Sequence, residues 1–199
     1  MMWENNDKII EQMIKGSTGE LWGNKLEQTD HYKILKTMLE IVGNNDGTLV
    51  DIGCGAGDVS RSWNGRYIGI DLDWIINGVA KKCNPSKEYI TIDVSKDEIK
   101  LSGSVKCVLM NAFLEMFPDP LSIIRKIYCS IDTDWIIVHR QKLGNTSHTI
   151  TSKSYANVDI CCSTISFTDL EALEQQASIK ELSIVNWVGD YYTLLMRMK

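Results

Sequence analysis

The sequence predicts an α/β fold, with a mostly parallel sheet covered by helices on both faces. Short apolar segments typical of buried strands alternate with helical segments over most of the 199 residues. A glycine-rich turn follows the first of these strands. The last two strands, predicted at 180–188 and 191–198, are joined at Gly189 and Asp190 as a hairpin, so one strand must run antiparallel to the rest.

Residues 1–45 are expected to be helical. Apolar residues within 9–14 have the spacing of one helix face, and residues 32–42 repeat that pattern. The glycine-containing stretches 16–19 and 43–47 are expected to end these two helices.

Five strands follow, and helical segments connect most of them. We predict strands at 48–52, 67–71, 88–93, 105–110 and 134–139, with a short helix near Asp58 and longer ones at 74–82 and 120–131. Pro120 directly after Asp119 is typical of a helix start. Thr168, with Glu171 three residues later, predicts a capped helix that runs to about residue 177.

Length and composition favour a single domain. A chain of 199 residues with 44% hydrophobic residues can bury a sizeable core. We expect a helical cap (1–45) and a core (46–199) within one domain, 1–199. The polar segment 141–167 is long for a loop and is predicted to be an insertion that forms part of a substrate pocket.

Charge and apolar patterning exclude several classes of partner. The net charge is −5 without a lysine or arginine block, which argues against nucleic acid. No apolar run reaches the ~18 residues of a membrane span, and the first residues lack a signal-peptide pattern. The six cysteines show no metal-ligand spacing, so we expect no metal and reduced thiols in a cytoplasmic protein.

The most specific motif is the turn after the first strand. Asp51 lies at the end of that strand, three glycines alternate within 53–57, and Asp71 closes the next strand. Such glycines expose backbone on which a nucleoside cofactor can lie, and the carboxylate of Asp71 can accept hydrogen bonds from ribose hydroxyls. Asp58 occupies the position of the third glycine of a dinucleotide motif, where its charge would repel a pyrophosphate.

The segment 49–58 closely resembles motif I of the class I S-adenosylmethionine-dependent methyltransferases, Asp-x-Gly-x-Gly-x-Gly. A Rossmann-like, seven-stranded sheet with one reversed strand is the fold of that family, so the closing hairpin supports the resemblance independently. Residues 114–120 also resemble a family segment, with Met116 in place of a histidine. The resemblance extends from residue 49 to 199 and implies in-line transfer of a sulfonium methyl group.

The resemblance also implies which residues bind the cofactor. Asp93 would accept a hydrogen bond from the adenine amino group, and the chain around Asn111 and Ala112 would lie beside the methionine part. The expected cofactor-binding residues are Asp51, Gly53, Cys54, Gly55, Gly57, Asp71, Leu72, Asp93, Val94, Asn111 and Ala112.

Candidate residues for the acceptor molecule lie after the fifth strand and near the N-terminus. His139 is the candidate catalytic base, because a pKa near ~6.5 suits removal of a hydroxyl proton; a buried histidine with satisfied hydrogen bonds is the simpler alternative. Arg140, Tyr155 and Trp22 are candidate substrate contacts. Trp22 and Tyr32 are also candidates for a lid that excludes water, with core packing as the alternative for Tyr32.

These residues predict a methyltransferase that acts on a small-molecule acceptor, with O-methylation slightly favoured over N-methylation because of His139. The Asn/Asp-Pro-Pro-Tyr/Phe motif of many nucleic-acid and protein methyltransferases does not follow the fourth strand. A non-catalytic S-adenosylmethionine-binding subunit that works with a partner protein is the alternative. An NAD-dependent oxidoreductase is opposed by Asp58 and by the closing hairpin. The sequence does not predict the oligomeric state.

Overall fold

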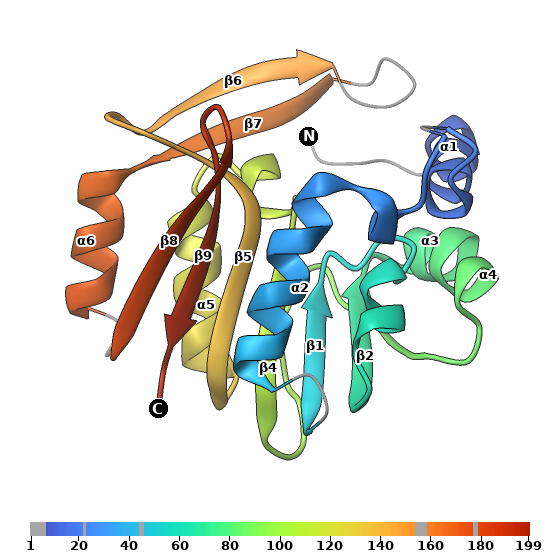
Figure 1. Cartoon of the computed structure of the whole chain (residues 1–199), viewed down its shortest axis with the longest axis horizontal. Helices are drawn as coiled ribbons and strands as arrows, with labels where there is room; N and C mark the ends of the chain where they lie inside the picture. Colours follow the sequence, from blue (N-terminus) through green and yellow to red (C-terminus); the bar gives the residue numbers. More distant parts are fainter. Residues whose placement is uncertain (1–6, 22, 44–45, 154–158, 177–178) are drawn as a thin grey trace.

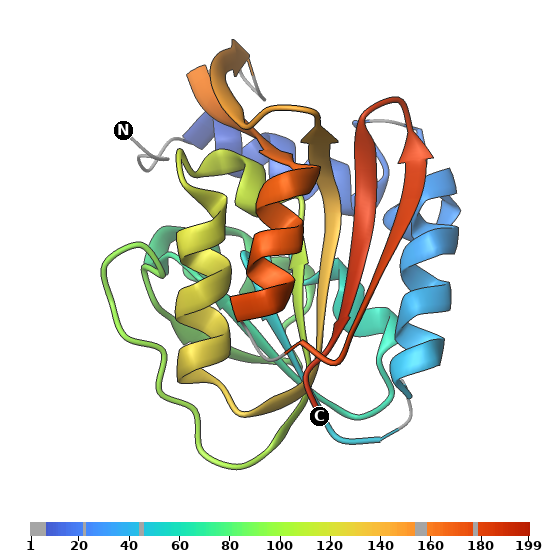
Figure 2. The same cartoon turned by 90° about the vertical axis from the view of Figure 1, so that its left-hand side faces the viewer.

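The computed structural model describes residues 7–21, 23–43, 46–153, 159–176 and 179–199. In this part of the chain, nine strands form one sheet, and helices cover both of its faces (Figures 1 and 2). The predicted fold class is therefore confirmed. None of the described helices is long and apolar enough to cross a membrane.

The parallel part of the sheet positions the site. It consists, in spatial order, of β3 (Glu88–Thr91), β2 (Arg66–Asp71), β1 (Thr48–Ile52), β4 (Val105–Asn111) and β5 (Thr133–Gly144). The strand order reverses at β1, which lies between β2 and β4. The carboxyl ends of parallel strands around such a switch point form the usual ligand crevice of an open α/β sheet.

The other side of β5 carries two hairpins. In the C-terminal hairpin, β9 (Tyr191–Arg197) runs antiparallel to both β5 and β8 (Glu181–Val188). In the second, β6 (His148–Lys153) pairs antiparallel with β7 (Asp159–Ser166), and β7 continues parallel to the end of β5. The prediction of seven strands with one reversed is thus wrong in number, because the segment 141–167, expected to be a loop, contains the β6–β7 hairpin.

The helices lie close to their predicted positions. They are α1 (Asp7–Thr18), α2 (Asp30–Val42), α5 (Pro120–Ser130) and α6 (Phe167–Gln176), with one helical run made of α3 (Asp73–Ile75), the π-helical η3 (Ile76–Ala80) and α4 (Lys81–Cys83). The short 3₁₀ helices are η1 (Leu26–Gln28), η2 (Asp58–Ser62) and η4 (Leu114–Met116).

Side chains of the parallel strands alternate between two apolar cores. Val50, Val108 and Ile136 pack on the face that α5 and α6 cover. Their neighbours in the sequence, Leu109 and Ile137, pack on the opposite face, which α2 covers. Figure 2 shows these two helical layers on either side of the sheet. This two-residue period is the reason for the continuous apolar runs of β1, β4 and β5.

Local hydrogen bonds fix the helix starts. Asp119 accepts a bond from the backbone N–H of Ser122 (3.1 Å), with Pro120 at the first position of α5, as predicted. The predicted start of α6 is wrong by two residues. Ser166, not Thr168, is its cap, because the Ser166 hydroxyl accepts a hydrogen bond from the N–H of Asp169 (3.0 Å).

Candidate functional site

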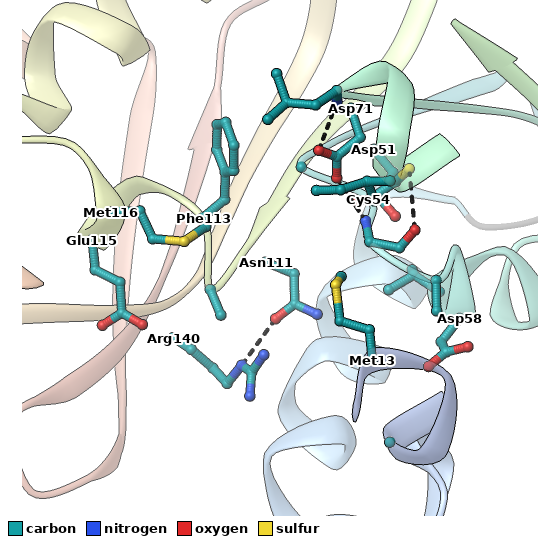
Figure 3. A pocket seen from close by; sticks show the side chains of 18 of the residues that line it. Met13, Asp51, Cys54, Asp58, Asp71, Asn111, Phe113, Glu115, Met116 and Arg140 are labelled. Carbon is teal, nitrogen blue, oxygen red and sulfur yellow. Dashed lines mark hydrogen bonds between the residues drawn. The ribbon is translucent and has the colours of Figure 1, made fainter. Parts of the chain in front are cut away.

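A cavity of about 1690 Å³ lies at the carboxyl ends of β1, β2, β4 and β5. Parts of α1, of α2 and of the β6–β7 hairpin complete its walls. Figure 3 shows this cavity from close by. Its volume exceeds the ~300–1,000 Å³ of a typical single-ligand site. The cavity therefore has room for a cofactor and a second molecule together.

The glycine loop after β1 requires its glycines. Gly53, Gly55 and Gly57 all have positive φ angles, of +72°, +54° and +74°. A Cβ atom on Gly53 would lie 2.1 Å from the ring of Phe113. The N–H groups of Gly53 and Cys54 both bond to the carbonyl of Ile70, at 2.8 and 3.2 Å. The loop thus turns sharply back onto β2 and brings bare backbone to the cavity.

The carboxylate of Asp71 holds this loop from the end of β2. Its two oxygens accept hydrogen bonds from the backbone N–H groups of Gly55 (2.9 Å) and Leu72 (2.8 Å), which Figure 3 shows as dashed lines. Burial raises the pKa of Asp71 to about 6, against the effect of these two bonds. Each oxygen can accept a second bond, so the carboxylate can still receive a ligand hydroxyl.

Asp51 is a buried carboxylate beneath the loop. It is 1% exposed, and Oδ2 accepts a bond from the Tyr67 hydroxyl (2.7 Å). Its other oxygen, Oδ1, has no hydrogen-bond partner among the described residues. Burial raises its pKa to about 7, and the negative charges of Asp71 and Asp58 add to the rise. A positively charged or N–H-bearing ligand would satisfy this orphaned oxygen.

Helix α1 docks on the glycine loop through Asp58. The Ser17 hydroxyl donates to Oδ1 of Asp58 (2.5 Å), which also accepts a bond from Arg61 (2.9 Å). Arg61 in turn pairs with Glu27. The argument that Asp58 repels a pyrophosphate is therefore weaker than the sequence suggested, because the Arg61 guanidinium offsets part of its charge.

The wall beyond β3 combines one ion-paired carboxylate with aromatic rings. Asp93 accepts hydrogen bonds from the N–H of Ser95 (3.1 Å) and from Lys96 (2.7 Å). The rings of Phe113 and Phe117 meet edge to face, with centroids 4.9 Å apart. All five residues line the cavity. An apolar surface beside a hydrogen-bonding turn is a suitable environment for a flat heterocycle.

Two strained, non-glycine residues line the cavity, one directly after β4 and one within β5. Ala112 and Arg140 have φ angles of +50° and +61°, and the β5–β9 register shifts at Arg140. Nε of Arg140 donates to Oδ1 of Asn111 (3.1 Å; Figure 3). Strain of this kind concentrates at functional sites.

Glu115 faces the same part of the cavity from η4. Its Oε2 is buried and has no hydrogen-bond partner in the described part of the chain. Burial raises the pKa of Glu115, and the nearby charges of Arg140 and Lys142 oppose the rise. This end of the cavity therefore presents charged groups of both signs.

Most of the predicted site residues lie together. Those that line the cavity are Asp51, Gly53, Cys54, Gly55, Asp71, Leu72, Asp93, Val94, Asn111, Ala112 and Arg140. Gly57 lies in the loop without lining the cavity. The two predicted substrate contacts Trp22 and Tyr155 lie outside the described residues. The roles assigned to all these residues stay predictions.

His139 does not lie where we expected it. It is 1% exposed and is absent from the cavity lining. Its ring faces α2 and β9, where Nε2 lies 3.1 Å from Nδ1 of His31 and Nδ1 lies 2.7 Å from the Thr193 hydroxyl. Burial lowers its pKa to about 2. This position matches the simpler alternative, a buried histidine whose two ring nitrogens have hydrogen-bond partners. His139 lies within β5 and not in the loop after it.

Tyr32 also belongs to the core. It is buried against the apolar cluster under α2, and its hydroxyl bonds to Ser62. Of the two alternatives for Tyr32, core packing is therefore correct and the lid role is not. Sequence reasoning missed other cavity residues, namely Met13, Ser17, His31, Lys142, Cys162 and Tyr191. They come from helix faces and strands whose sequence patterns indicate only packing.

The residues present fit a nucleoside cofactor that carries positive charge. Gly53 and Gly55 expose backbone to the cavity, and Asp51 has a buried oxygen without a partner among the described residues. The acidic side chains that line the cavity are Asp51, Asp58, Asp71, Asp73, Asp93 and Glu115. Such a lining complements a cation better than a pyrophosphate.

The fold and this loop define a cofactor-binding α/β protein of the methyltransferase class. A family model described as a methyltransferase domain matches residues 26–178, which is most of the chain. The chain therefore belongs to this methyltransferase family, and the predicted resemblance and enzyme class are confirmed. A search of curated proteins found no match.

Solved structures agree in fold at low sequence identity. The amino pentose methyltransferase CalS10 of Micromonospora echinaspora, bound to S-adenosylmethionine, is 10% identical with a TM-score of 0.65, and all of both chains is covered. Streptomyces venezuelae DesVI is 8% identical (TM-score 0.67; 98% and 99% covered). Human N-acetylserotonin methyltransferase with S-adenosylmethionine is 14% identical (TM-score 0.67), covering 96% of this chain and 56% of that one. Two of these structures, CalS10 and the human enzyme, contain S-adenosylmethionine, in agreement with the predicted cofactor.

Proposed function

We propose that the protein transfers a methyl group from S-adenosylmethionine to a small-molecule acceptor. The observation that carries the proposal is a pair of carboxylates, the buried Asp51 and the half-buried Asp71, around a glycine loop of bare backbone. Burial raises the pKa of both carboxyl groups, to about 7 and about 6. A bound cation would lower both pKa values and so favour the ionised carboxylates. The sulfonium and ammonium groups of S-adenosylmethionine carry such positive charges.

Each part of the cofactor has a candidate partner. Asp71 would accept hydrogen bonds from the ribose hydroxyls while it holds Gly55 and Leu72. Asp93 and Val94, with the Phe113 ring nearby, would bind the adenine. The unpaired Oδ1 of Asp51 and the backbone near Asn111 would face the methionine part. These roles agree with the family resemblance and with the position of every one of these groups on the cavity wall.

The main task of the protein in this reaction would be to align the methyl donor with the acceptor. The cofactor supplies a methyl group already activated by its sulfonium, so the chain must hold the acceptor in line and keep water out. The glycine loop and Asp71 would fix the donor, and α1, tied to the loop by the Ser17–Asp58 hydrogen bond (2.5 Å), would cover it. The acceptor's lone pair forms the new bond as the carbon–sulfur bond breaks, and an acceptor hydroxyl must lose its proton.

The acceptor side of the cavity is the end that contains Arg140, Glu115 and Lys142, together with the β6–β7 hairpin. Its mixed charges suit a polar metabolite rather than an apolar one. The amino pentose acceptor of CalS10 belongs to that protein, and it guides the choice of compounds to test here. The preference for O-methylation depended on His139 as a base, and its enclosed position removes that support. Product analysis decides between oxygen and nitrogen.

Calorimetry tests the cofactor first. S-adenosylmethionine, S-adenosylhomocysteine and NAD are titrated into the wild type, into Asp71→Asn and into Glu171→Gln. Glu171 is an exposed carboxylate on α6 outside the cavity, so its variant is the matched control. We expect both adenosyl compounds to bind the wild type and the control equally, and at least about tenfold more weakly to Asp71→Asn, since a charge-assisted bond is worth ~1.5–3 kcal/mol.

Binding of NAD alone would overturn the cofactor assignment. Equal binding of S-adenosylhomocysteine to Asp71→Asn and wild type would refute the ribose role of Asp71. With the cofactor established, amino and hydroxy sugars and related metabolites are screened for formation of S-adenosylhomocysteine. Mass spectrometry of the product then identifies the methylated atom. Turnover only in the presence of an added partner protein would favour the non-catalytic-subunit alternative.

A further inference from the structure

Three buried polar side chains form a chain of hydrogen bonds from inside the sheet to the cavity. Thr193 on β9 lies opposite His139 on β5 in the strand register. The Thr193 hydroxyl is 2.7 Å from Nδ1 of His139, and Nε2 of His139 is 3.1 Å from Nδ1 of His31, in the first turn of α2. His31 lines the cavity, whereas His139 and Thr193 do not.

The direction of these bonds follows from the one proton of the threonine hydroxyl. Thr193 is 0% exposed, and among the described residues its hydroxyl has a single partner, Nδ1 of His139. A buried hydroxyl that donates to nothing is costly, so it donates to Nδ1. A neutral His139 then carries its proton on Nε2 and donates to Nδ1 of His31. A neutral His31 must consequently carry its own proton on Nε2.

Both rings are neutral near pH 7. Burial lowers the pKa of His139 to about 2, and the positive charge of Arg140 acts in the same direction. The pKa of His31 is lowered to about 4, chiefly by burial and also by the positive charge of Arg140, while Asp30 opposes the shift. Near pH 7, therefore, Thr193 donates to His139 and His139 donates to His31. Nε2 of His31 then carries a proton and is a hydrogen-bond donor.

The remaining nitrogen of His31 is available to a ligand. The His31 ring contacts His139 and, edge to face, Trp187, with centroids 5.1 Å apart. Nε2 has no hydrogen-bond partner among the described residues, and it is not one of their fully buried unpartnered atoms, so it is accessible. Since His31 lines the cavity, the accessible Nε2–H is expected to point into that space.

We propose that His31 binds an anionic oxygen of the acceptor molecule, a carboxylate or a phosphate, through a fixed Nε2–H donor. His139 and Thr193 are positioning residues that set the direction of this donor. Arg140, which follows His139 directly, is the charged residue of the cavity lining whose field acts on His31, and its positive charge favours an anionic oxygen there over a neutral one. With Nδ1 occupied, His31 cannot take a proton from the acceptor. The inference rests on the proposed function for the identity of the bound molecule.

Nitrogen NMR of the histidine rings tests the polarity directly. The chain has only three histidines, so long-range ¹H–¹⁵N spectra of the whole protein saturated with S-adenosylhomocysteine are simple to assign from His148→Asn and His31→Gln. We expect His31 and His139 to be single Nε2–H tautomers at pH 7. A His31 that carries its proton on Nδ1, or that is positively charged at pH 7, overturns the inference and restores a base role.

Two variants test the role of Thr193. In Thr193→Val the shape is kept and the donor is lost, so we expect His31 to lose its single tautomer and show a mixture. Thr193→Ser retains the hydroxyl and should restore the single Nε2–H form. A His31 tautomer unchanged in Thr193→Val overturns the positioning role of Thr193.

Inorganic phosphate and acetate test the ligand. Added to the S-adenosylhomocysteine complex, at least one should shift the His31 Nε2–H proton in a saturable manner and leave the exposed His148 unchanged. Absence of a His31 shift with both anions refutes the anionic-oxygen assignment. Failure of S-adenosylhomocysteine itself to bind contradicts the proposed function instead, and the tautomers can still be determined in the free protein.

Discussion

Replacing Gly53 by alanine tests whether the glycine loop has the shape on which the whole site depends. A non-glycine residue at φ +72° costs about 1–2 kcal/mol. The new Cβ would also lie 2.1 Å from a carbon of the Phe113 ring, and overpacking of this kind costs about 1–3 kcal/mol more. We therefore expect Gly53→Ala to lower the free energy of unfolding by about 2–5 kcal/mol, the sum of the two effects.

Gly103 is the matched control. It has a similar positive φ of +89°, and a Cβ there would meet nothing within 4 Å. Gly103→Ala should therefore show only the backbone cost, about 1–2 kcal/mol. Urea unfolding followed by circular dichroism measures both variants, and calorimetry measures S-adenosylhomocysteine binding to the folded protein. Binding should weaken strongly in Gly53→Ala and stay unchanged in Gly103→Ala.

A double-mutant cycle isolates the contact between Gly53 and Phe113. Phe113→Ala removes the ring that the new methyl group would strike, so Gly53→Ala should be less harmful in that background, by about 1–3 kcal/mol. Equal destabilisation by Gly53→Ala and Gly103→Ala, together with additive behaviour in the cycle, would refute the geometry described for the loop.

Further predictions concern charge and capping. The pKa of Asp51 is about 7 in the folded protein against an ordinary 3.8, so the folded state holds the proton more tightly and stability falls as pH rises from about 4 to about 7. In the wild type the free energy of unfolding should fall by on the order of 4 kcal/mol between pH 4 and pH 7, and in Asp51→Asn this fall should be absent. Urea unfolding at pH 4 and pH 7 measures the difference, and the same pH dependence in both proteins would contradict the burial of this carboxyl. Binding of S-adenosylmethionine near pH 6.5 should release protons, because its positive charge lowers the pKa of Asp51 and Asp71, and calorimetry in buffers of different ionisation enthalpy measures the release; the absence of release argues against a cation beside these groups. Ser166→Ala should lower the free energy of unfolding by about 1 kcal/mol because the α6 cap is lost, whereas Thr168→Ala should change it by less than about 0.5 kcal/mol. A larger effect of Thr168→Ala in thermal unfolding would show that Thr168 is the cap after all.

The parallel half of the fold could be predicted because burial on both faces leaves a plain signal. β1 and β4 contribute side chains to both apolar cores, so their sequences are continuous apolar runs. The β6–β7 hairpin leaves no such signal. Residues 148–153 are mostly polar, and Ile150 there is 51% exposed, so no apolar period marks the strand. Polar strands at the edge of a sheet look like a loop in the sequence.

For a different reason, the sequence could also predict that the candidate cofactor-binding residues lie together in one cavity. These residues follow directly after β1, β2 and the segments beyond β3 and β4, and parallel strands bring their carboxyl ends together. The cavity residues that the sequence did not predict come instead from other elements, for example Met13 on α1, His31 on α2 and Cys162 on β7. Their positions depend on how these elements pack against the sheet, and a helical period does not specify that packing.

Two features of β5, its length and an irregularity at Arg140, explain where His139 and Arg140 lie. The apolar run suggested that β5 ends at residue 139, which would put the histidine at the mouth of the crevice. Pairing with β9 carries β5 on to Gly144, so His139 lies within the sheet under α2. In a regular strand the next side chain would simply point to the opposite face, but the register shift and the φ of +61° at Arg140 turn it toward the cavity. The irregularity thus brings Arg140 into the cavity lining, whereas His139 contacts the cavity-lining His31 without lining the cavity itself.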